Sequence, residues 1–397
     1  MKVLIVGGGI GGLTAALCCA HFGHDVIVLE QADAFGEVGA GIQIPPNAMK
    51  VFAALGLQDR IARDAVEPAA IQARMGRSGR EVFTVPLAAE SRQSWGAPYL
   101  HIHRADYIAA LFESLPTAPS VQVRLGEAVT KINQDAAAVT ITLRDGSTET
   151  GDVLIGADGI HSTVRGWLLG PDQPVFTGNV AWRATVPMEA LGDAAPERTA
   201  CVWMGPGRHA VTYQLRRGNM ANFVGVVERD ELVAEGWSEQ GSQAEALSDF
   251  AGWHPTIMRL IEAVPNDALF RWALYDRPPL SCWTDERVAL LGDAAHPMLP
   301  FLAQGAAMAV EDAWVLAEAI SDPDRPVSES LKAYQAQRLP RTSRVQAGSR
   351  ANAKTFHKRT LPAQLMAYGP MWLAGQIGPS IVRGRLDWLY GYDVTGD

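Results

Sequence analysis

The first residues of this chain restrict its fold most strongly, because the apolar run 2–6 is followed by the glycine-rich segment 7–12 and then by small residues. A strand, turn and helix of this kind place the N–H groups of a helix N-terminus beside the phosphates of a dinucleotide. Gly7 permits the sharp turn, Gly9 lets the backbone approach a pyrophosphate, and Gly12 lets the helix pack closely on the strand. The segment therefore predicts an adenine-dinucleotide site, with a purely structural glycine turn as the alternative.

A second apolar run, 25–29, ends at Glu30. A carboxylate at the end of the second strand accepts hydrogen bonds from both hydroxyls of an adenosine ribose. The same negative charge disfavours a phosphate on the 2′ position. Glu30 therefore predicts that the site selects a dinucleotide without a 2′-phosphate.

Composition narrows the class of protein further. The chain has 397 residues, a hydrophobic fraction of 48%, a charged fraction of 19% and a formal net charge of -9. This balance is typical of a two-domain globular enzyme and argues against a nucleic-acid partner, which needs a basic face. The four cysteines lack metal-binding or disulfide spacing, so we expect a cytoplasmic protein without a metal site. The apolar segment 361–389 is interrupted by prolines and Arg383, so integral membrane association is not expected.

The order of predicted strands and helices indicates an α/β fold interrupted by antiparallel strands. Apolar strands that end in glycine recur at 152–156 and 287–292, as expected for a parallel sheet. Segments 121–125 and 138–143 alternate in hydrophobicity and predict a β-meander inserted into the first domain. We expect a discontinuous dinucleotide-binding domain formed by 1–72, 99–175 and 271–345. A substrate domain is expected at 73–98 and 176–270, and a C-terminal helical segment at 346–397.

Three strand ends with glycine and a nearby acid combine in one chain: 7–12, 156–159 and 292–297. With these motifs the sequence resembles, over nearly its whole length, the single-component FAD-dependent aromatic hydroxylases. It is most similar to the branch of salicylate hydroxylase, 3-hydroxybenzoate 6-hydroxylase and 6-hydroxynicotinate 3-monooxygenase. The resemblance implies a p-hydroxybenzoate hydroxylase-like fold, in which a Rossmann-type ββα FAD-binding domain carries an inserted antiparallel-sheet substrate domain.

The resemblance also implies the residues that bind the cofactor. Asp293 is expected at the ribityl and pyrophosphate groups of FAD, Arg104 near its phosphates, and Asp158 with Arg165 in a segment linked to FAD and to the reduced nicotinamide nucleotide. The alternatives are a helix N-cap for Asp293, a surface salt bridge for Arg104 and a capped turn for Asp158. Because the chain has one such glycine turn, NADH or NADPH is expected to visit transiently.

The segment 297–306 is expected to line the flavin. Its prolines, including Pro300, and its lack of charge suit a dry wall, which protects an oxygenated flavin from discharge as hydrogen peroxide. A helix that begins at Gly305 and Ala306 offers free N–H groups that would stabilise the anionic reduced flavin. Gln304 precedes this helix and is a candidate for a water-mediated proton route.

Two candidates for substrate activation lie in the predicted strand 209–215. His209 and Tyr213 are four residues apart, so both project from one face of a strand. The resembling hydroxylases share this spacing, and either group is suited to accept or relay the proton of a substrate hydroxyl. A structural pair on the strand is the alternative.

A further candidate is Gln43, in the segment expected at the edge of the flavin, which also includes Gly41 and Ile42. The hydroxynicotinate branch has histidine at the position of Gln43, and a neutral amide orients a substrate but accepts no proton near neutral pH.

Together these features predict an FAD monooxygenase that uses NADH or NADPH and O2 to hydroxylate a small phenolic or hydroxy-heteroaromatic substrate through a flavin hydroperoxide. A carboxylate on the substrate would need an anchor, for which Arg183 is a candidate with a structural alternative. Two other functions are open: oxidation of a polycyclic, quinone or alkene substrate, and a non-catalytic FAD-binding redox sensor. The assembly is expected to be a monomer or a homodimer.

Overall fold

The computed structural model describes residues 1–36, 40–116, 120–171, 173–229, 240–265 and 268–396. Its first sheet is parallel except for the edge strand β17, which runs antiparallel to β18. The strands follow the order β17 (Thr284–Asp285), β18 (Val288–Leu290), β11 (Val153–Gly156), β1 (Lys2–Val6), β2 (Asp25–Glu30) and β7 (Val121–Leu125).

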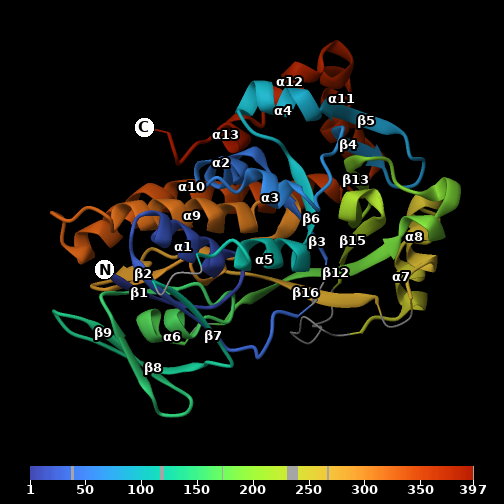
Figure 1. Cartoon of the computed structure of the whole chain (residues 1–397). Helices are drawn as coiled ribbons and strands as arrows, with labels where there is room; N and C mark the ends of the chain where they lie inside the picture. The colour runs from blue at the N-terminus through green and yellow to red at the C-terminus, as the bar shows by residue number, and fades with distance from the viewer. Residues whose placement is uncertain (37–39, 117–119, 172, 230–239, 266–267, 397) are drawn as a thin grey trace.

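Continuous apolar runs form the central strands of this sheet because both of its faces are covered. Val3, Leu4 and Ile5 of β1 are fully buried. Helices α1 (Ile10–His21) and α9 (Gly305–Ala319) pack against each other, and α9 also packs on α10 (Val327–Phe356), as Figure 1 shows. Small residues bring α1 and α9 together: a Cβ on Gly11 would lie 3.4 Å from the Cβ of Ala309.

The second sheet is antiparallel except where β13 runs parallel to β4. Its order is β16 (Phe270–Asp276), β12 (Val175–Pro187), β15 (Met220–Glu228), β14 (Arg208–Leu215), β13 (Thr199–Gly205), β4 (Ala70–Met75) and β5 (Glu81–Pro86). One face packs on α7 (Gln243–Asp249) and α8 (Pro255–Glu262) through side chains such as Trp182, Phe223 and Phe250. The opposite face, which we call the site face, is turned toward the first sheet and its helices (Figure 1).

The predicted β-meander is partly wrong. Strands β8 (Val129–Gln134), β9 (Val139–Leu143) and β10 (Thr148–Gly151) form a small antiparallel sheet, but β7 pairs parallel with β2. Strand β7 lies at an edge and is only partly covered, so its sequence alternates like that of a half-exposed antiparallel strand. Strands β3 (Gly41–Ile44) and β6 (Leu100–His103) form a separate antiparallel pair.

The remaining helices connect the sheets or belong to the C-terminal part of the chain. Helix α10 is continuous over Val327–Phe356, so the expected boundary between 345 and 346 falls inside a helix. Helix α11 packs on β5 (Figure 1). None of the described helices is both long and apolar enough to cross a membrane. The remaining bounds are α2 (Pro46–Ala54), α3 (Gln58–Ala62), α4 (Ala88–Trp95), α5 (Arg104–Phe112), α6 (Thr163–Leu169), α11 (Leu361–Ile377), α12 (Pro379–Gly384) and α13 (Asp387–Tyr390).

Candidate active site

The glycine turn between β1 and α1 leaves open space where a pyrophosphate would lie. Gly7 has a φ of 102°, and a Cβ on Gly12 would lie 1.9 Å from the carbonyl oxygen of Gly7. Beside Gly9, by contrast, a Cβ would meet no atom within 4 Å. Gly9 is also the N-cap of α1 and has no capping side chain, so the first N–H groups of the helix face this space.

Glu30 is held beside the same turn by backbone hydrogen bonds. Its Oε2 accepts from the N–H of Gly8 at 2.6 Å, and its Oε1 accepts from the N–H of Ala32 at 2.9 Å. The carboxylate stays partly exposed and keeps further lone pairs for a ribose diol. This position agrees with the role that the sequence predicts for Glu30.

Asp293 and Arg104 come from different elements and interact electrostatically. Asp293 follows β18 in the 3-10 turn Gly292–Ala294, and Arg104 begins α5. Burial raises the pKa of Asp293, and this effect outweighs the electrostatic interactions with His296, Arg104 and Arg165, which lower it. Burial lowers the pKa of Arg104, and Asp293 opposes this change. Within the described ranges, Asp293 caps no helix and Arg104 forms no salt bridge, so neither alternative role is seen.

Asp158 does take the capping role that was its alternative. Its carboxylate accepts hydrogen bonds from the Ser162 hydroxyl at 2.5 Å and from the N–H groups of Thr163 at 2.7 Å and Val164 at 3.1 Å. The turn is tied to the Asp293 region because Arg165 Nη1 donates to the carbonyl of Ala294 at 3.0 Å. Contact of Asp158 with FAD remains a prediction.

Among the residues that the structure describes, the start of α9 presents a buried side-chain donor without a partner. Gln304 is the N-cap residue, but its side chain forms no cap; its Oε1 accepts from Asn47 Nδ2 at 3.1 Å. Gln304 Nε2 is buried and has no hydrogen-bond partner within the described part of the chain. The N–H groups of Gly305 and Ala306 follow it, and Pro300 lies in the preceding 3-10 turn Pro300–Leu302. These donors suit the carbonyl groups and the negative charge of a reduced flavin.

Strand β3 lies close to the site face of the second sheet. The N–H of Gly41 donates to Asn222 Oδ1 at 2.7 Å. A Cβ on Gly41 would lie 2.4 Å from Cε2 of Tyr213, so this contact requires glycine. Ile42 follows, and Gln43 Oε1 accepts a hydrogen bond from the hydroxyl of Tyr99. The structure therefore brings the predicted residues Gly41, Gln43 and Tyr213 into one region.

His209 and Tyr213 lie on the same face of β14, as their spacing predicts. The pairing registers place them at two corners of a patch on the site face. Val211 lies between them on β14, Val224 lies opposite Val211 on β15, and Arg183 lies opposite Val224 on β12. Strands are about 4.8 Å apart, so Arg183 stands roughly 10 Å from the His209–Tyr213 strand.

Burial gives the two candidate groups different chemistry. The buried ring of His209 has a pKa far below its usual range because of desolvation and the neighbouring His357. Desolvation raises the pKa of the Tyr213 phenol well above its usual range, although Arg183 opposes this. At neutral pH, His209 is therefore a neutral proton acceptor, whereas Tyr213 stays protonated and donates a hydrogen bond.

One residue of this region was missed by sequence reasoning. His101 on β6 has a ring 4.5 Å from the ring of Tyr213, is fully buried, and has no partner for either ring nitrogen within the described residues. Desolvation lowers its pKa to about 3, so it is neutral. Its place depends on the pairing of β3 with β6, which periodicity does not reveal.

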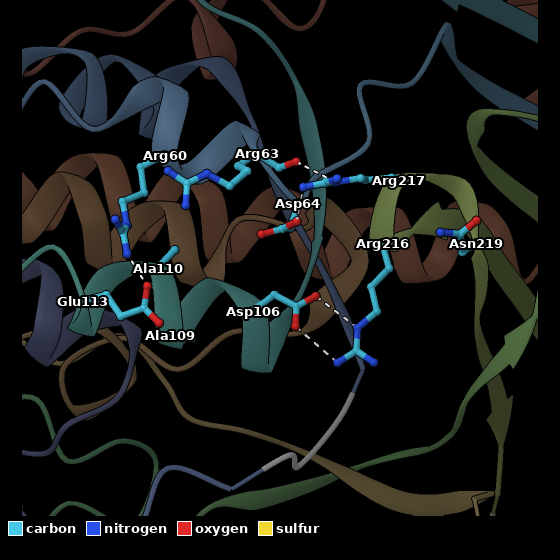
Figure 2. A pocket seen from close by; sticks show the side chains of 10 residues that line it. All are labelled: Arg60, Arg63, Asp64, Asp106, Ala109, Ala110, Glu113, Arg216, Arg217 and Asn219. Carbon is cyan, nitrogen blue, oxygen red and sulfur yellow. Dashed lines mark hydrogen bonds and ion pairs between the residues drawn. The ribbon is translucent and has the colours of Figure 1, made fainter.

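A charged cleft of about 520 Å³ lies where the β14–β15 turn meets α3 and α5, and Figure 2 shows its side chains. Arg216 donates to Asp106 at 3.1 and 3.2 Å, and Arg217 donates to Asp64 at 2.8 Å. Arg60 and Glu113 form a further ion pair. The Arg216–Asp106 pair joins the turn that follows the Tyr213 strand to the helix that begins at Arg104. The Arg217–Asp64 pair joins the same turn to the segment after α3, and the Arg60–Glu113 pair joins α3 to the end of α5.

The residues present fit FAD. Open space at Gly9 suits the pyrophosphate, Glu30 suits the adenosine ribose, Asp293 suits the ribityl hydroxyls, and the buried Gln304 Nε2 suits a flavin carbonyl. Val211 and Val224 of the patch on the site face cluster with Leu299 and Phe301 of the 297–306 segment. This fold and this site fit an FAD-dependent monooxygenase.

Comparisons with known proteins agree with this class. The family model described as FAD binding domain matches residues 1–349, and the chain belongs to this family. The chain is 37% identical to a 3-amino-4-hydroxybenzoate 2-monooxygenase of Streptomyces platensis, over 99% of this chain and 96% of that protein. It is 38% identical to a 3-hydroxybenzoate 6-hydroxylase of Aquipseudomonas alcaligenes, over 99% and 98%.

A solved structure supports the same assignment. HpxO of Klebsiella pneumoniae, complexed with FAD and uric acid, superposes with a TM-score of 0.87 at 30% identity, covering 98% of this chain and 97% of that one. The protein is an FAD-dependent aromatic monooxygenase. The predicted family, fold class and FAD cofactor are confirmed. The residue roles remain predictions.

Replacing Asp293 with alanine is expected to weaken FAD binding. The ribityl hydroxyls would lose a charged acceptor, which costs about 1.5 to 3 kcal/mol, or roughly 10- to 150-fold in Kd. The measurement is FAD retained after dialysis, with fluorescence titration of the apoprotein. Asp322→Ala, at an exposed turn, is the control. A variant that keeps its full FAD content and wild-type Kd would contradict the assigned role of Asp293.

Proposed function

We propose that the protein uses NADH or NADPH and O2 to hydroxylate a small phenolic or hydroxy-heteroaromatic substrate that carries a carboxylate. The observation that carries this proposal is the patch on the site face. An imidazole, a phenol and a guanidinium surround an apolar centre formed by Val211 and Val224. Such a patch suits a planar ring with a hydroxyl at one edge and a negative charge at another. The hydroxybenzoate substrates in the names of the relatives have this chemistry.

Arg183 is the proposed anchor for the carboxylate. Its guanidinium lies 4.2 Å from the ring centre of Trp272, and within the described ranges it pairs with no acid. Burial lowers the pKa of Arg183 to about 10, so it remains a cation at neutral pH. A half-buried cation of this kind gains most from an anionic ligand, since charge-assisted hydrogen bonds strengthen away from water.

Arg183→Met is expected to raise the Kd for a hydroxybenzoate by roughly 30- to 150-fold, the equivalent of losing about 2 to 3 kcal/mol. The same variant should bind the phenol that lacks the carboxylate as well as the wild type does. Flavin absorbance titration measures both constants. Arg271→Met is the matched control, because Arg271 stacks on Trp182 at 5.9 Å on the opposite face. Equal weakening for both ligands would contradict an anchoring role.

The remaining groups of the patch are proposed to prepare the substrate ring. FAD, when bound, supplies electron transfer from the nicotinamide to O2 and activation of the oxygen. His209 accepts the proton of the substrate hydroxyl, which makes the ring electron-rich, and Tyr213 orients the same oxygen by a hydrogen bond. Leu299 and Phe301 pack against Val224 and keep this part of the site face apolar. Exclusion of water there favours oxygen transfer over release of peroxide.

The nicotinamide nucleotide is proposed to dock in a second cleft, of about 600 Å³, beside the Asp158 turn. His161, Arg165 and Arg277 line it, together with Phe176 and Tyr275, whose rings are 5.7 Å apart. Cations and aromatic rings in one cleft suit a pyrophosphate and a flat heterocycle.

We also propose a cytoplasmic location, because all four cysteines, each in the described part of the chain, are thiols rather than disulfides.

A further inference from the structure

His209 is linked to the edge of the molecule by hydrogen bonds that the proposed reaction does not itself require. Its Nδ1 lies 2.7 Å from Nε2 of His357, and Nδ1 of His357 lies 3.0 Å from Oε1 of Glu228. His209 is 2% exposed and His357 6%, whereas the side chain of Glu228 is 34% exposed and pairs with Arg359. The three groups therefore lead from the site face to solvent.

Three separate elements hold this arrangement in place. His209 belongs to β14, Glu228 ends β15, and His357 is the C-cap residue of α10. The N–H of Gly207, in the β13–β14 turn, donates to the carbonyl of His357 at 3.3 Å. His357 also lies at the negative end of a long helix, which favours a positive charge on its ring.

The protonation state of Glu228 determines which atom donates and which accepts in each hydrogen bond of this network. Burial raises the pKa of Glu228, but hydrogen bonds from Arg359 and His357 outweigh this and hold the pKa below its usual range. An ionised carboxylate only accepts, so the Nδ1–H of His357 must donate to Glu228. Burial, Arg359 and Arg208 outweigh Glu228 and lower the pKa of His357, so its ring is neutral and its Nε2 accepts. The hydrogen between the two imidazoles then belongs to Nδ1 of His209.

This order leaves Nε2 of His209 as an unprotonated acceptor, and that atom has no hydrogen-bond partner within the described ranges. We infer that His357, held by Glu228, is a positioning residue that fixes His209 in the tautomer able to accept the substrate proton and that passes this proton on toward solvent. The inference rests on the proposed role of His209. It resembles the way in which a buried acid sets the tautomer of a catalytic histidine.

The proton transfers balance without any other reactant. The substrate O–H bond breaks as an N–H bond forms at Nε2 of His209. The Nδ1–H of His209 then passes to Nε2 of His357, and the Nδ1–H of His357 passes to Glu228, which releases a proton to water. No electrons leave the network, but the transfers leave both imidazoles protonated at Nε2 and unprotonated at Nδ1. The starting tautomers return when a proton from water enters at Glu228 and the same transfers run in reverse to reprotonate the product oxygen.

His357→Phe is expected to lower the hydroxylation rate by about 10- to 100-fold. His357→Gln should recover part of this loss, because its amide oxygen can still accept from Nδ1 of His209. A readout independent of turnover is ¹⁵N NMR of histidine-labelled holoprotein, with the His209 signals assigned by their absence from His209→Gln. Wild type should show a protonated Nδ1 and an unprotonated Nε2, and His357→Phe should show a mixed or reversed pattern. His21→Gln, at an exposed helix end, is the control.

Two outcomes separate this inference from the proposed function. If His209→Gln hydroxylates at the wild-type rate, the role of His209 is wrong and the relay falls with it. If His209→Gln is slow but His357→Phe keeps both the wild-type rate and the wild-type tautomer of His209, the relay alone is overturned. FAD content and thermal unfolding of each variant establish that the comparison is between folded holoproteins.

Discussion

Replacing His209 with glutamine is expected to slow hydroxylation by about 10²- to 10⁴-fold, the usual cost of losing a positioned proton acceptor. FAD should stay bound, because His209 lies on β14, in the second sheet and apart from the glycine turn, Glu30 and Asp293. Flavin reduction should be affected less than oxygen transfer, so the variant should consume NAD(P)H and release hydrogen peroxide. Product formation and peroxide, measured in the same reaction, give this ratio.

Tyr213→Phe is the companion variant in this test. Because burial holds the phenol protonated, loss of the hydroxyl removes a hydrogen-bond donor rather than a base. We therefore expect Tyr213→Phe to weaken orientation of the substrate while leaving the pH dependence that His209 sets. Since the pKa of His209 is depressed, its neutral form should persist below its ordinary titration range. If both variants keep the wild-type rate, coupling and pH dependence, the activating groups lie elsewhere, with Gln43 and Gln304 as the next candidates.

Replacing Arg338 with methionine is expected to destabilise the protein by about 3 to 5 kcal/mol, the usual cost of breaking a buried ion pair. Arg338 lies 2.7 Å from both Glu311 and Asp312, and all three side chains are fully buried. Burial lowers the pKa of Arg338, but these carboxylates outweigh it and raise the pKa above its usual range. The same network reaches Gln304 at the start of α9, because Asn47 donates to Glu311 at 2.6 Å and to Gln304 at 3.1 Å.

Denaturant unfolding of apoprotein and holoprotein measures this loss. Arg325→Met is the matched control, since Arg325 pairs with Asp322 at 3.5 Å on the surface, with both side chains about two-fifths exposed. An exposed pair contributes about 0 to 1 kcal/mol. An Arg338→Met protein that unfolds within about 1 kcal/mol of the control would contradict the importance assigned to the buried charges.

Local pattern predicts the dinucleotide half of this molecule well, and the reason is physical. Gly7, Gly12 and Glu30 lie within one strand–turn–helix–strand unit. Residues that are neighbours in such a unit are also close in sequence, so the sequence pattern predicts which of them lie together. The His209–Tyr213 face is likewise local, because a strand alternates its side chains with a period of two.

Long-range pairing is what sequence reasoning did not recover. His101 contacts Tyr213 because β6, which pairs with β3, packs against β14 of the second sheet. His357 and His209 are hydrogen-bonded although they are 148 residues apart in the sequence. His357 ends a helix that runs through the expected boundary between 345 and 346, so the sequence did not predict where this helix ends. Periodicity indicates whether a side chain is covered but not which residues cover it. The structure was therefore needed to find the Gln304 donor, which has no partner among the described residues, and the hydrogen bonds from His209 through His357 to Glu228.

The central claim is that this flavoprotein transfers one oxygen atom from O2 to a hydroxy-aromatic carboxylate. It is tested most directly by incubating the FAD-loaded protein with NADH or NADPH under ¹⁸O2 and a panel of salicylate, 3-hydroxybenzoate, 3-amino-4-hydroxybenzoate and 6-hydroxynicotinate. Products are measured by mass spectrometry, with nucleotide consumption and peroxide in parallel. We expect at least one panel member to gain a single ¹⁸O atom, with nucleotide consumption that matches product formation. Nucleotide oxidation that is unaffected by every panel member and ends entirely in peroxide would contradict it.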